Sequence, residues 1–246
     1  MRFFLFVDLD MEILSDTFDI INSIKDKLGY CVLALIDPDP KNDKKIDLIL
    51  EKINLSNSNA ILIGGSSISD DKYEERVKYI KDNTDLPLIV FPGSSKQITK
   101  YIDTILYLNL ISGRNPKYLI EEQVKGSLNI YNFKIHAIPT AYILLDGGNM
   151  TSVANVSKTK PLSMLDMDVV LSHALAGQYL GNQLIYFDNG SGAQNKININ
   201  LLEYINKYID IPIIVGGGLK NDKDIQEVVE AGASYVVLGT YFESLL

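Results

Sequence analysis

Three glycine-rich turns in the last third of the chain each follow a short apolar run, an arrangement typical of an anion site. The turns are 188–192 (DNGSG), 215–218 (VGGG) and 237–240 (VLGT). Glycine lets backbone N–H groups approach a ligand closely, and a helix that follows adds the partial positive charge of its N-terminus. One such turn is weak evidence, but three after consecutive predicted strands indicate a single phosphate held by backbone amides.

Asp188 stands directly before the first glycine turn, where a carboxylate could take a proton from a substrate hydroxyl. It could equally be an aspartate that only forms the turn. Tyr186 alternates with Asp188 in the preceding apolar run, so both side chains are expected on the same side of the strand. The phenol could therefore hydrogen-bond the same ligand, and packing in the core is the alternative.

A second carboxylate, Asp37, ends the apolar run 31–36 and is followed by Pro38 and Asp39. Mg²⁺ prefers a few carboxylate oxygens together with water and phosphate. Asp37 is therefore a candidate Mg²⁺ ligand, and Asp39 could be a second one. The alternative is that an aspartate here caps a helix near Pro40.

Two other loops after predicted strands carry polar groups. The turn 64–67 (GGSS) could bind a second phosphate or the metal, or its serines could cap the next helix. Arg114, in the loop 112–116 (SGRNP), is a candidate partner for a diphosphate because arginine forms paired hydrogen bonds to phosphate oxygens. An ordinary surface arginine is the alternative. His136 lies in an apolar run, which is typical of a core histidine, and His173 carries no special signal.

The composition excludes several classes of protein. The chain has 246 residues, a formal net charge of −8, one cysteine and two histidines. General nucleic-acid binding needs a basic face, and a single cysteine allows neither an internal disulfide nor a multi-cysteine metal site. No run approaches the roughly 20 apolar residues of a membrane span, and the apolar start 1–7 is too short for a signal-peptide core. We therefore expect a cytoplasmic protein with at most peripheral membrane contact.

Strand-like apolar runs alternate with helical patterns along the whole chain. The expected strands are 31–36, 60–63, 86–91, 104–108, one within 135–145, 184–187, 211–215 and 235–238. Strands that are apolar throughout and separated by helices indicate a parallel sheet covered on both faces. Because polar and glycine residues recur at the end of almost every strand, we favour a closed (β/α)8 barrel over an open doubly wound sheet. Residues 1–246 are expected to form one such domain, with an N-terminal extension and helix at about 1–30.

The expected barrel departs from the regular pattern after its third strand. Only twelve residues separate Phe91 from Thr104, and they begin with Pro92 and Gly93. A full crossover helix with its loops needs about a dozen residues or more, so the third helix should be missing or vestigial. The gap would leave an apolar groove on the barrel flank that could accept a long apolar ligand. The alternative is a short helix at 96–101.

Taken together, these motifs resemble the geranylgeranylglyceryl phosphate synthases and the related heptaprenylglyceryl phosphate synthases. The segments 145–148 (LDGG) and 157–161 (SKTKP) are most similar to the larger enzymes of that family. The matching segments, in the family's order, are 34–40 (ALIDPDP), 61–67 (ILIGGSS), 86–98 (LPLIVFPGSSKQI), 111–120 (ISGRNPKYLI), 138–148 (IPTAYILLDGG), 174–193 (ALAGQYLGNQLIYFDNGSGA) and 211–240.

The resemblance implies a prenyltransferase on a modified barrel that lacks a regular third helix. Such enzymes join sn-glycerol 1-phosphate to a polyprenyl diphosphate, here with geranylgeranyl diphosphate favoured, and release diphosphate. Asp37 and Ser66 match the family's Mg²⁺ site, and relatives form dimers or hexamers, so a homo-oligomer is expected. The glycerol phosphate site is implied at Tyr186, Phe187, Asp188, Asn189, Gly190, Ser191, Gly192, Gly217, Gly218, Gly239 and Thr240.

Three departures from the family pattern bear on activity. Asp188 stands where the family usually has a glutamate that takes the proton of the glycerol 3-hydroxyl, and a misplacement of about 1 Å can lower a rate on the order of 100-fold. Thr240 replaces an asparagine, and Pro40 stands where lysine is common. Two alternatives follow: a catalytically impaired barrel that only binds a phosphate ligand, and another barrel enzyme that acts on a small phosphorylated substrate.

Overall fold

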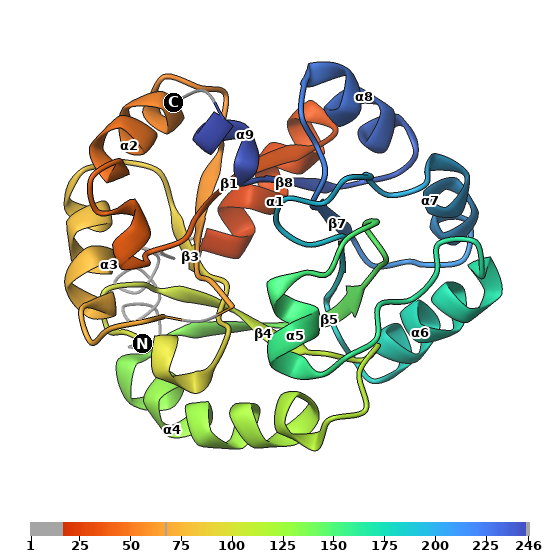
Figure 1. The fold of residues 1–246 in the computed structure, drawn as a ribbon, viewed down its shortest axis with the longest axis horizontal. Helices are drawn as coiled ribbons and strands as arrows, with labels where there is room; N and C mark the ends of the chain where they lie inside the picture. Colours follow the sequence, from red (N-terminus) through yellow and green to blue (C-terminus); the bar gives the residue numbers. More distant parts are fainter. Residues whose placement is uncertain (1–16, 67, 245–246) are drawn as a thin grey trace, which may run out of the picture.

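A closed parallel barrel forms the centre of the molecule (Figure 1), as described by a computed structural model for residues 17–66 and 68–244. Its strands neighbour one another in chain order from β1 to β8, and β8 pairs with β1. The expected barrel is confirmed and the open sheet is wrong. The strands are β1 Cys31–Ile36, β2 Ala60–Ile63, β3 Leu88–Val90, β4 Thr104–Asn109, β5 His136–Leu144, β6 Leu184–Asp188, β7 Ile213–Gly216 and β8 Tyr235–Leu238.

Successive residues of each strand point alternately into the barrel interior and towards the surrounding helices. Both faces of the sheet are buried, which is why the strands are apolar throughout. On β6, Leu184 and Tyr186 belong to the interior cluster, whereas Ile185 and Phe187 pack in the outer layer against helices. Asp188 continues the inward series, as the alternation predicted. The side chains at the carboxyl ends of the strands, Asp188 among them, therefore lie around one end of the barrel, which we call its mouth.

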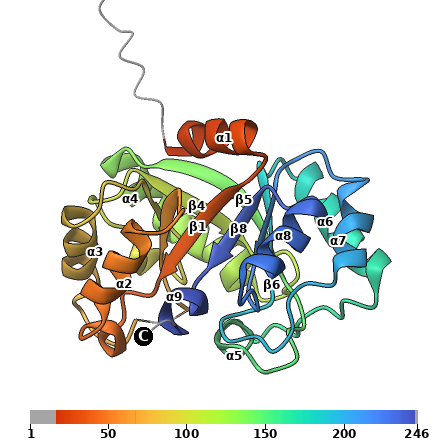
Figure 2. The ribbon, with the colours of Figure 1, turned by 90° about the horizontal axis from the view of Figure 1, so that it is seen from above.

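Helices surround the barrel, and one lies across its amino-terminal end. The helices are α1 Thr17–Leu28, α2 Ile46–Asn54, α3 Tyr73–Asp82, α4 Glu122–Phe133, α5 Ser152–Ser157, α6 Met167–Tyr179, α7 Ile199–Asn206, α8 Asp222–Glu230 and α9 Thr240–Ser244. Figure 2 shows α1 over the end of the barrel opposite the mouth, where Ile21 is buried in the interior cluster and Tyr235 donates a hydrogen bond to Asn22. The predicted N-terminal helix is confirmed; the expected extension before it lies outside the described residues.

The helix that a regular barrel has between its third and fourth strands is vestigial here, as predicted. A single 3-10 turn, Ser95–Gln97, connects β3 to β4, and no helix covers 96–101 in this described segment. Gly126 lets α4 close over this turn, because a Cβ added there would lie 2.5 Å from Ile98 Cδ1. The β3–β4 ladder has two residue pairs, fewer than any other neighbouring pair of described strands. The boundary between β3 and β4 therefore has the shortest ladder of the barrel and no regular helix of its own outside it.

None of the helices in the described part of the chain is both long enough and apolar enough to cross a membrane.

Candidate active site at the carboxyl ends of the strands

The glycine turns after β6 and β7 lie directly against each other. Asn189 N donates a hydrogen bond to the Gly216 carbonyl at 3.0 Å. Gly217 has φ +84°, and a Cβ added there would lie 2.8 Å from the Gly190 amide nitrogen. The turn at Gly239 ends β8, the next strand in the barrel. Two of the glycine turns are therefore in contact and the third follows the neighbouring strand, an arrangement that suits one phosphate at the mouth.

The loop that follows Asp188 is fixed onto α8. Asn189 Nδ2 donates to the Asn195 carbonyl at 3.1 Å, and Lys196 Nζ lies 2.5 Å from both Asp224 and Glu227. A Cβ at Gly218 would lie 2.6 Å from the same Asn195 carbonyl, so this glycine is required by close backbone approach. The backbone of the turn after Asp188 is thus held in place by contacts within the chain itself.

Asp188 is buried next to the glycine turns after β6, β7 and β8, which we call the glycine nest. One carboxylate oxygen accepts a hydrogen bond from the Gly190 amide at 2.7 Å, and the other accepts one from the Tyr142 hydroxyl. Burial raises the pKa of the Asp188 carboxyl, and the bonds from Tyr142 and Gly190 oppose the rise. A raised carboxyl pKa makes a stronger base, so the position suits proton acceptance at the mouth.

Tyr142 on β5 is a site residue that the sequence analysis missed. It pairs in register with Tyr186, and the two rings meet edge to face with centroids 5.3 Å apart. Phe91 packs on Tyr186 at 5.1 Å. Burial, followed by the charge of Asp188, places the pKa of both phenols well above the usual range. Both tyrosines therefore remain neutral, and the Tyr142 hydroxyl donates its hydrogen bond to the carboxylate.

Asp37 provides a second carboxylate at the mouth, from the end of β1. Its Oδ1 is buried without a hydrogen-bond partner among the described residues, while Oδ2 lies 2.5 Å from Lys41 Nζ. Burial raises the pKa of Asp37, and the Lys41 ammonium opposes the rise. A Cβ at Gly65 would lie 2.3 Å from Asp37 Oδ1, so the loop carrying Ser66 closes directly over the carboxylate.

This donor set fits Mg²⁺. The unpartnered Asp37 oxygen is a ready ligand, and the Ser66 loop adjoins it. The described residues contain no cluster of three or more His, Cys, Asp or Glu side chains that could hold a metal. A site with one carboxylate suits an ion that keeps several waters and takes its remaining ligands from a substrate phosphate.

Arg76 on α3 clamps the two loops that carry these donors. Its guanidinium lies 2.5 Å from Asp43, after β1, and 2.7 Å from Asp70, after β2. Its hydrogen bonds lower the pKa of Asp70 to about 2. Because Arg76 is buried and bonds both carboxylates bidentately, it fixes the loop of Asp37 against the loop of Ser66.

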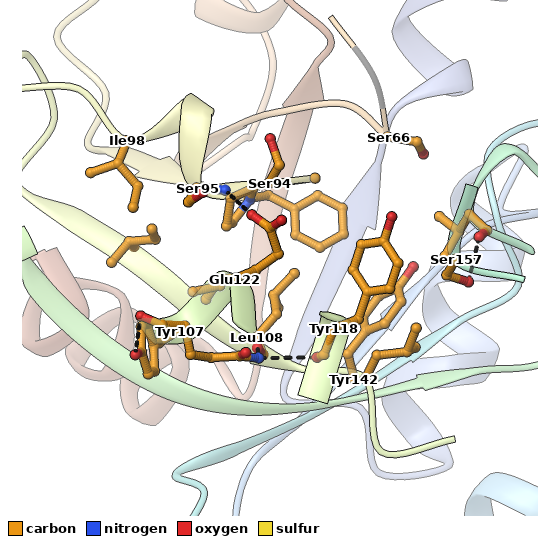
Figure 3. Close-up of a pocket in the computed structure, with 18 of the residues that line it drawn as sticks. Ser66, Ser94, Ser95, Ile98, Tyr107, Leu108, Tyr118, Glu122, Tyr142 and Ser157 are labelled. Atoms are coloured by element: carbon orange, nitrogen blue, oxygen red, sulfur yellow. Dashed lines mark hydrogen bonds between the residues drawn. The ribbon is translucent and has the colours of Figure 1, made fainter. Parts of the chain in front are cut away.

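An open pocket runs from this mouth into the flank left open by the vestigial helix. Figure 3 shows Ser66 and Ser157 towards one side and Ile98 and Tyr107 towards the other, with Glu122 accepting a hydrogen bond from the Ser95 amide at 2.7 Å. The lining is mainly apolar and comes from residues 91–95, Ile98, β4, α4, Tyr142 and α5. The expected flank groove is confirmed, and it opens beside the candidate metal ligands.

Comparison with known families matches residues 22–244 to the PcrB family. The chain belongs to the PcrB family. The geranylgeranylglyceryl phosphate synthase of Zunongwangia profunda is 42% identical over 89% of this chain and 93% of its own. The enzyme of the same name from Pyrococcus furiosus is 36% identical over 86% of this chain and 84% of its own.

A solved structure agrees with this membership in the PcrB family. The crystal structure of (S)-3-O-geranylgeranylglyceryl phosphate synthase from Thermoplasma acidophilum, in complex with sn-glycerol-1-phosphate, has a TM-score of 0.85 at 34% identity. The match covers 92% of this chain and 91% of that one. An N-acetylmannosamine-6-phosphate 2-epimerase from Clostridium perfringens, 14% identical with a TM-score of 0.56, shares the barrel fold alone.

The structure of this PcrB-family chain places the other predicted site residues as follows. Ser191, Gly192 and Thr240 are exposed at the rim of the mouth. Phe187 points into the outer layer, so only its backbone faces the site. Asp39 caps the 3-10 turn Pro40–Asn42 by accepting from the Lys41 amide, the alternative that the sequence allowed.

Arg114 is not brought together with the other candidates. Its guanidinium donates to the carbonyls of Ile111 and Gly113 and lies 3.2 Å from His173 on α6. It does not line the cavity. A role in diphosphate binding stays a prediction for Arg114. Lys41, which reaches Asp37, is a cation at the mouth that the sequence analysis did not single out.

The Tyr142–Asp188 hydrogen bond gives a testable pH dependence. Replacing Tyr142 by phenylalanine removes a bond that lowers the pKa of Asp188, so that pKa rises further. A base must be deprotonated to act, so the acid limb of the pH–rate profile should move to higher pH and activity near neutrality should fall. Tyr204→Phe is the matched control, because Tyr204 donates to Asp168 on the outside of the barrel. An acid limb that stays in place in Tyr142→Phe contradicts the role of this bond.

Proposed function

We propose that this chain is a prenyltransferase that joins sn-glycerol 1-phosphate to a polyprenyl diphosphate, with geranylgeranyl diphosphate favoured. The observation that carries the proposal is the meeting of three features at one mouth. A glycine nest suited to a phosphate, a buried basic carboxylate and the opening of a long apolar groove adjoin one another. The similarity to named synthases supports the same activity.

The glycine nest would hold the phosphate of glycerol phosphate. The turns after β6 and β7 would offer the backbone amides beyond Gly190, whose own amide donates to Asp188, as a preorganised anion site. The solved relative contains sn-glycerol-1-phosphate, which supports this choice of substrate. Anchored by its phosphate, the substrate would present its 3-hydroxyl to Asp188.

Asp188 would act as the general base in the transfer. The hydroxyl oxygen forms a bond to the first prenyl carbon, while the bond from that carbon to the diphosphate oxygen breaks and its electron pair leaves on the diphosphate. The hydroxyl proton passes to the Asp188 carboxylate. Tyr142 keeps the carboxylate oriented, and much of the acceleration comes from holding both substrates in one geometry.

Asp37 and Ser66 would hold Mg²⁺ at the opposite side of the mouth. When bound, the ion would neutralise charge on the diphosphate group as it leaves. Arg76 would keep the two loops in register for this task. The prenyl tail would lie in the flank groove between the Ser95–Gln97 turn and α4, where apolar lining excludes water.

The proposal includes a homo-oligomer. The outer face of α4 and the turn before it carries an apolar stripe at helical spacing, with Ile120 62%, Val124 66% and Leu128 70% exposed. Exposed apolar stripes of this kind commonly mark protein–protein contact.

The proposal is tested by incubating the chain with radiolabelled sn-glycerol 1-phosphate, Mg²⁺ and prenyl diphosphates of several lengths. We expect label in the lipid extract, and loss of the product when EDTA removes the metal. Retained activity in EDTA would refute the metal requirement. Binding of glycerol phosphate without any lipid product would favour the impaired barrel. If the chain does not bind prenyl diphosphates, the result would favour the alternative that it is a barrel enzyme acting on another small phosphorylated substrate.

A further inference from the structure

Gln97, in the turn that replaces the third helix, ties together two loops at the mouth of the groove. Its side chain is 3% exposed. Its Oε1 accepts a hydrogen bond from the Gly93 amide at 2.9 Å, and its Nε2 donates one to the Gly65 carbonyl at 2.8 Å. One buried amide therefore links the loop after β2 to the loop after β3.

The two loops touch without any space between them. A Cβ at Gly64 would lie 1.7 Å from the Phe91 carbonyl oxygen, and a Cβ at Gly93 would lie 2.3 Å from the Gly65 carbonyl oxygen. Such contacts leave no room for a bridging water. The Gly65 carbonyl depends on Gln97 for a hydrogen-bond donor that its crowded surroundings cannot otherwise supply.

These loops form the boundary between the two halves of the prenyl diphosphate site. Gly65 closes over Asp37, and Ser66 and Gly93 line the cavity. A shift of Gly65 would move the Asp37 and Ser66 donors relative to the groove entrance. The glycine nest lies on β6, β7 and β8, across the closed barrel from β2 and β3.

We infer that Gln97 is a positioning residue for the prenyl diphosphate, which sets the spacing between the diphosphate end and the tail groove. The inference rests on the proposed function. Gln97 touches neither substrate in this scheme and acts through Gly65 and Gly93. Loss of its bonds should therefore weaken prenyl diphosphate binding and transfer while leaving glycerol phosphate binding intact.

Two variants separate the two bonds. Gln97→Met keeps the volume and removes both bonds, whereas Gln97→Glu keeps the acceptor for Gly93 and sets a carboxylate against the Gly65 carbonyl. Gln178→Met is the matched control. Gln178 accepts from the Asp210 amide at 2.8 Å and donates to its carboxylate at 3.2 Å, so it likewise joins two segments through one amide, away from the mouth.

The experiment measures steady-state kinetics, calorimetric binding of each substrate and thermal unfolding for all four proteins. Both Gln97 variants should raise the KM and Kd for geranylgeranyl diphosphate on the order of 10- to 100-fold. Their Kd for sn-glycerol 1-phosphate should stay within about twofold of the wild type, a split that general destabilisation does not produce.

Two outcomes overturn the inference: a Gln97→Glu protein that binds the prenyl diphosphate like wild type, or Gln97 variants that lose both substrates equally. Wild-type affinity in Gln97→Glu would show that the Gly65 bond is dispensable. Absence of product from both the wild type and Gln178→Met would instead refute the proposed function. The two failures are therefore distinguishable.

Discussion

Replacing Asp188 by asparagine should lower kcat on the order of 100- to 10,000-fold while leaving sn-glycerol 1-phosphate bound. Asparagine keeps the size of the side chain and can still accept from the Gly190 amide, but it cannot take a proton. In the proposed site the phosphate would be held by backbone amides, so its Kd should change little. Single-turnover product formation and calorimetric binding measure the two quantities on one preparation.

Asp146→Asn is the matched control for this result. Asp146 follows β5, and its carboxylate accepts from the Gly148 amide at 2.9 Å in the same turn geometry as Asp188 and Gly190. It should leave kcat near the wild-type value. If Asp188→Asn lost glycerol phosphate binding as well as kcat, the result would contradict the assignment of Asp188 as the general base. If the wild type itself is inactive and Asp188→Glu acquires activity, the shorter aspartate is what prevents the reaction.

Replacing Gly217 by alanine should destroy the phosphate site without unfolding the barrel. The new Cβ would lie 2.8 Å from both the amide nitrogen and the carbonyl oxygen of Gly190, so both turns must shift. The φ of +84° is also unfavourable for any residue with a Cβ. We expect the Kd for sn-glycerol 1-phosphate to rise at least about tenfold and kcat/KM to fall on the order of 100-fold.

Gly181→Ala separates backbone strain from the loss of the nest. Gly181 has a φ of +87°, and nothing lies within 4 Å of a Cβ added there. It should reduce stability by about 1–2 kcal/mol and leave substrate binding unchanged. Equal losses of binding in the two alanine variants, measured by calorimetry, would contradict a phosphate nest at Gly217.

Local pattern predicted the barrel because its strands are short, apolar and spaced by helices. Two of the expected strands begin later than predicted, at Leu88 and at Ile213. Pro87 and Pro212 directly precede them, and proline has no N–H to donate to a ladder. The vestigial helix between β3 and β4 followed from the length of that connection, which is too short for a regular crossover helix.

The parts of the site that escaped prediction depend on contacts between distant residues. Tyr142 lies in an apolar run, and only the register of β5 against β6 brings it to Asp188. Arg76 looks like any charged helix residue until α3 packs and its partners Asp43 and Asp70 converge. Gln97 lies in the matching segment 86–98, but nothing in its spacing indicates that its side-chain amide joins two loops. Short motifs could indicate the groups that face a ligand, but not those that hold such groups in place.

The short ladder between β3 and β4 would give a bound prenyl chain a structural role as well. An ordinary crossover helix would brace this seam from outside, and here a polyprenyl chain in the groove would cover the same apolar surface. A ligand that binds only the folded chain raises the free energy of unfolding by RT ln(1 + L/Kd), where L is the free ligand concentration. The prenyl chain would thus replace the packing of the missing helix, so we expect the protein to be most stable when this substrate is bound.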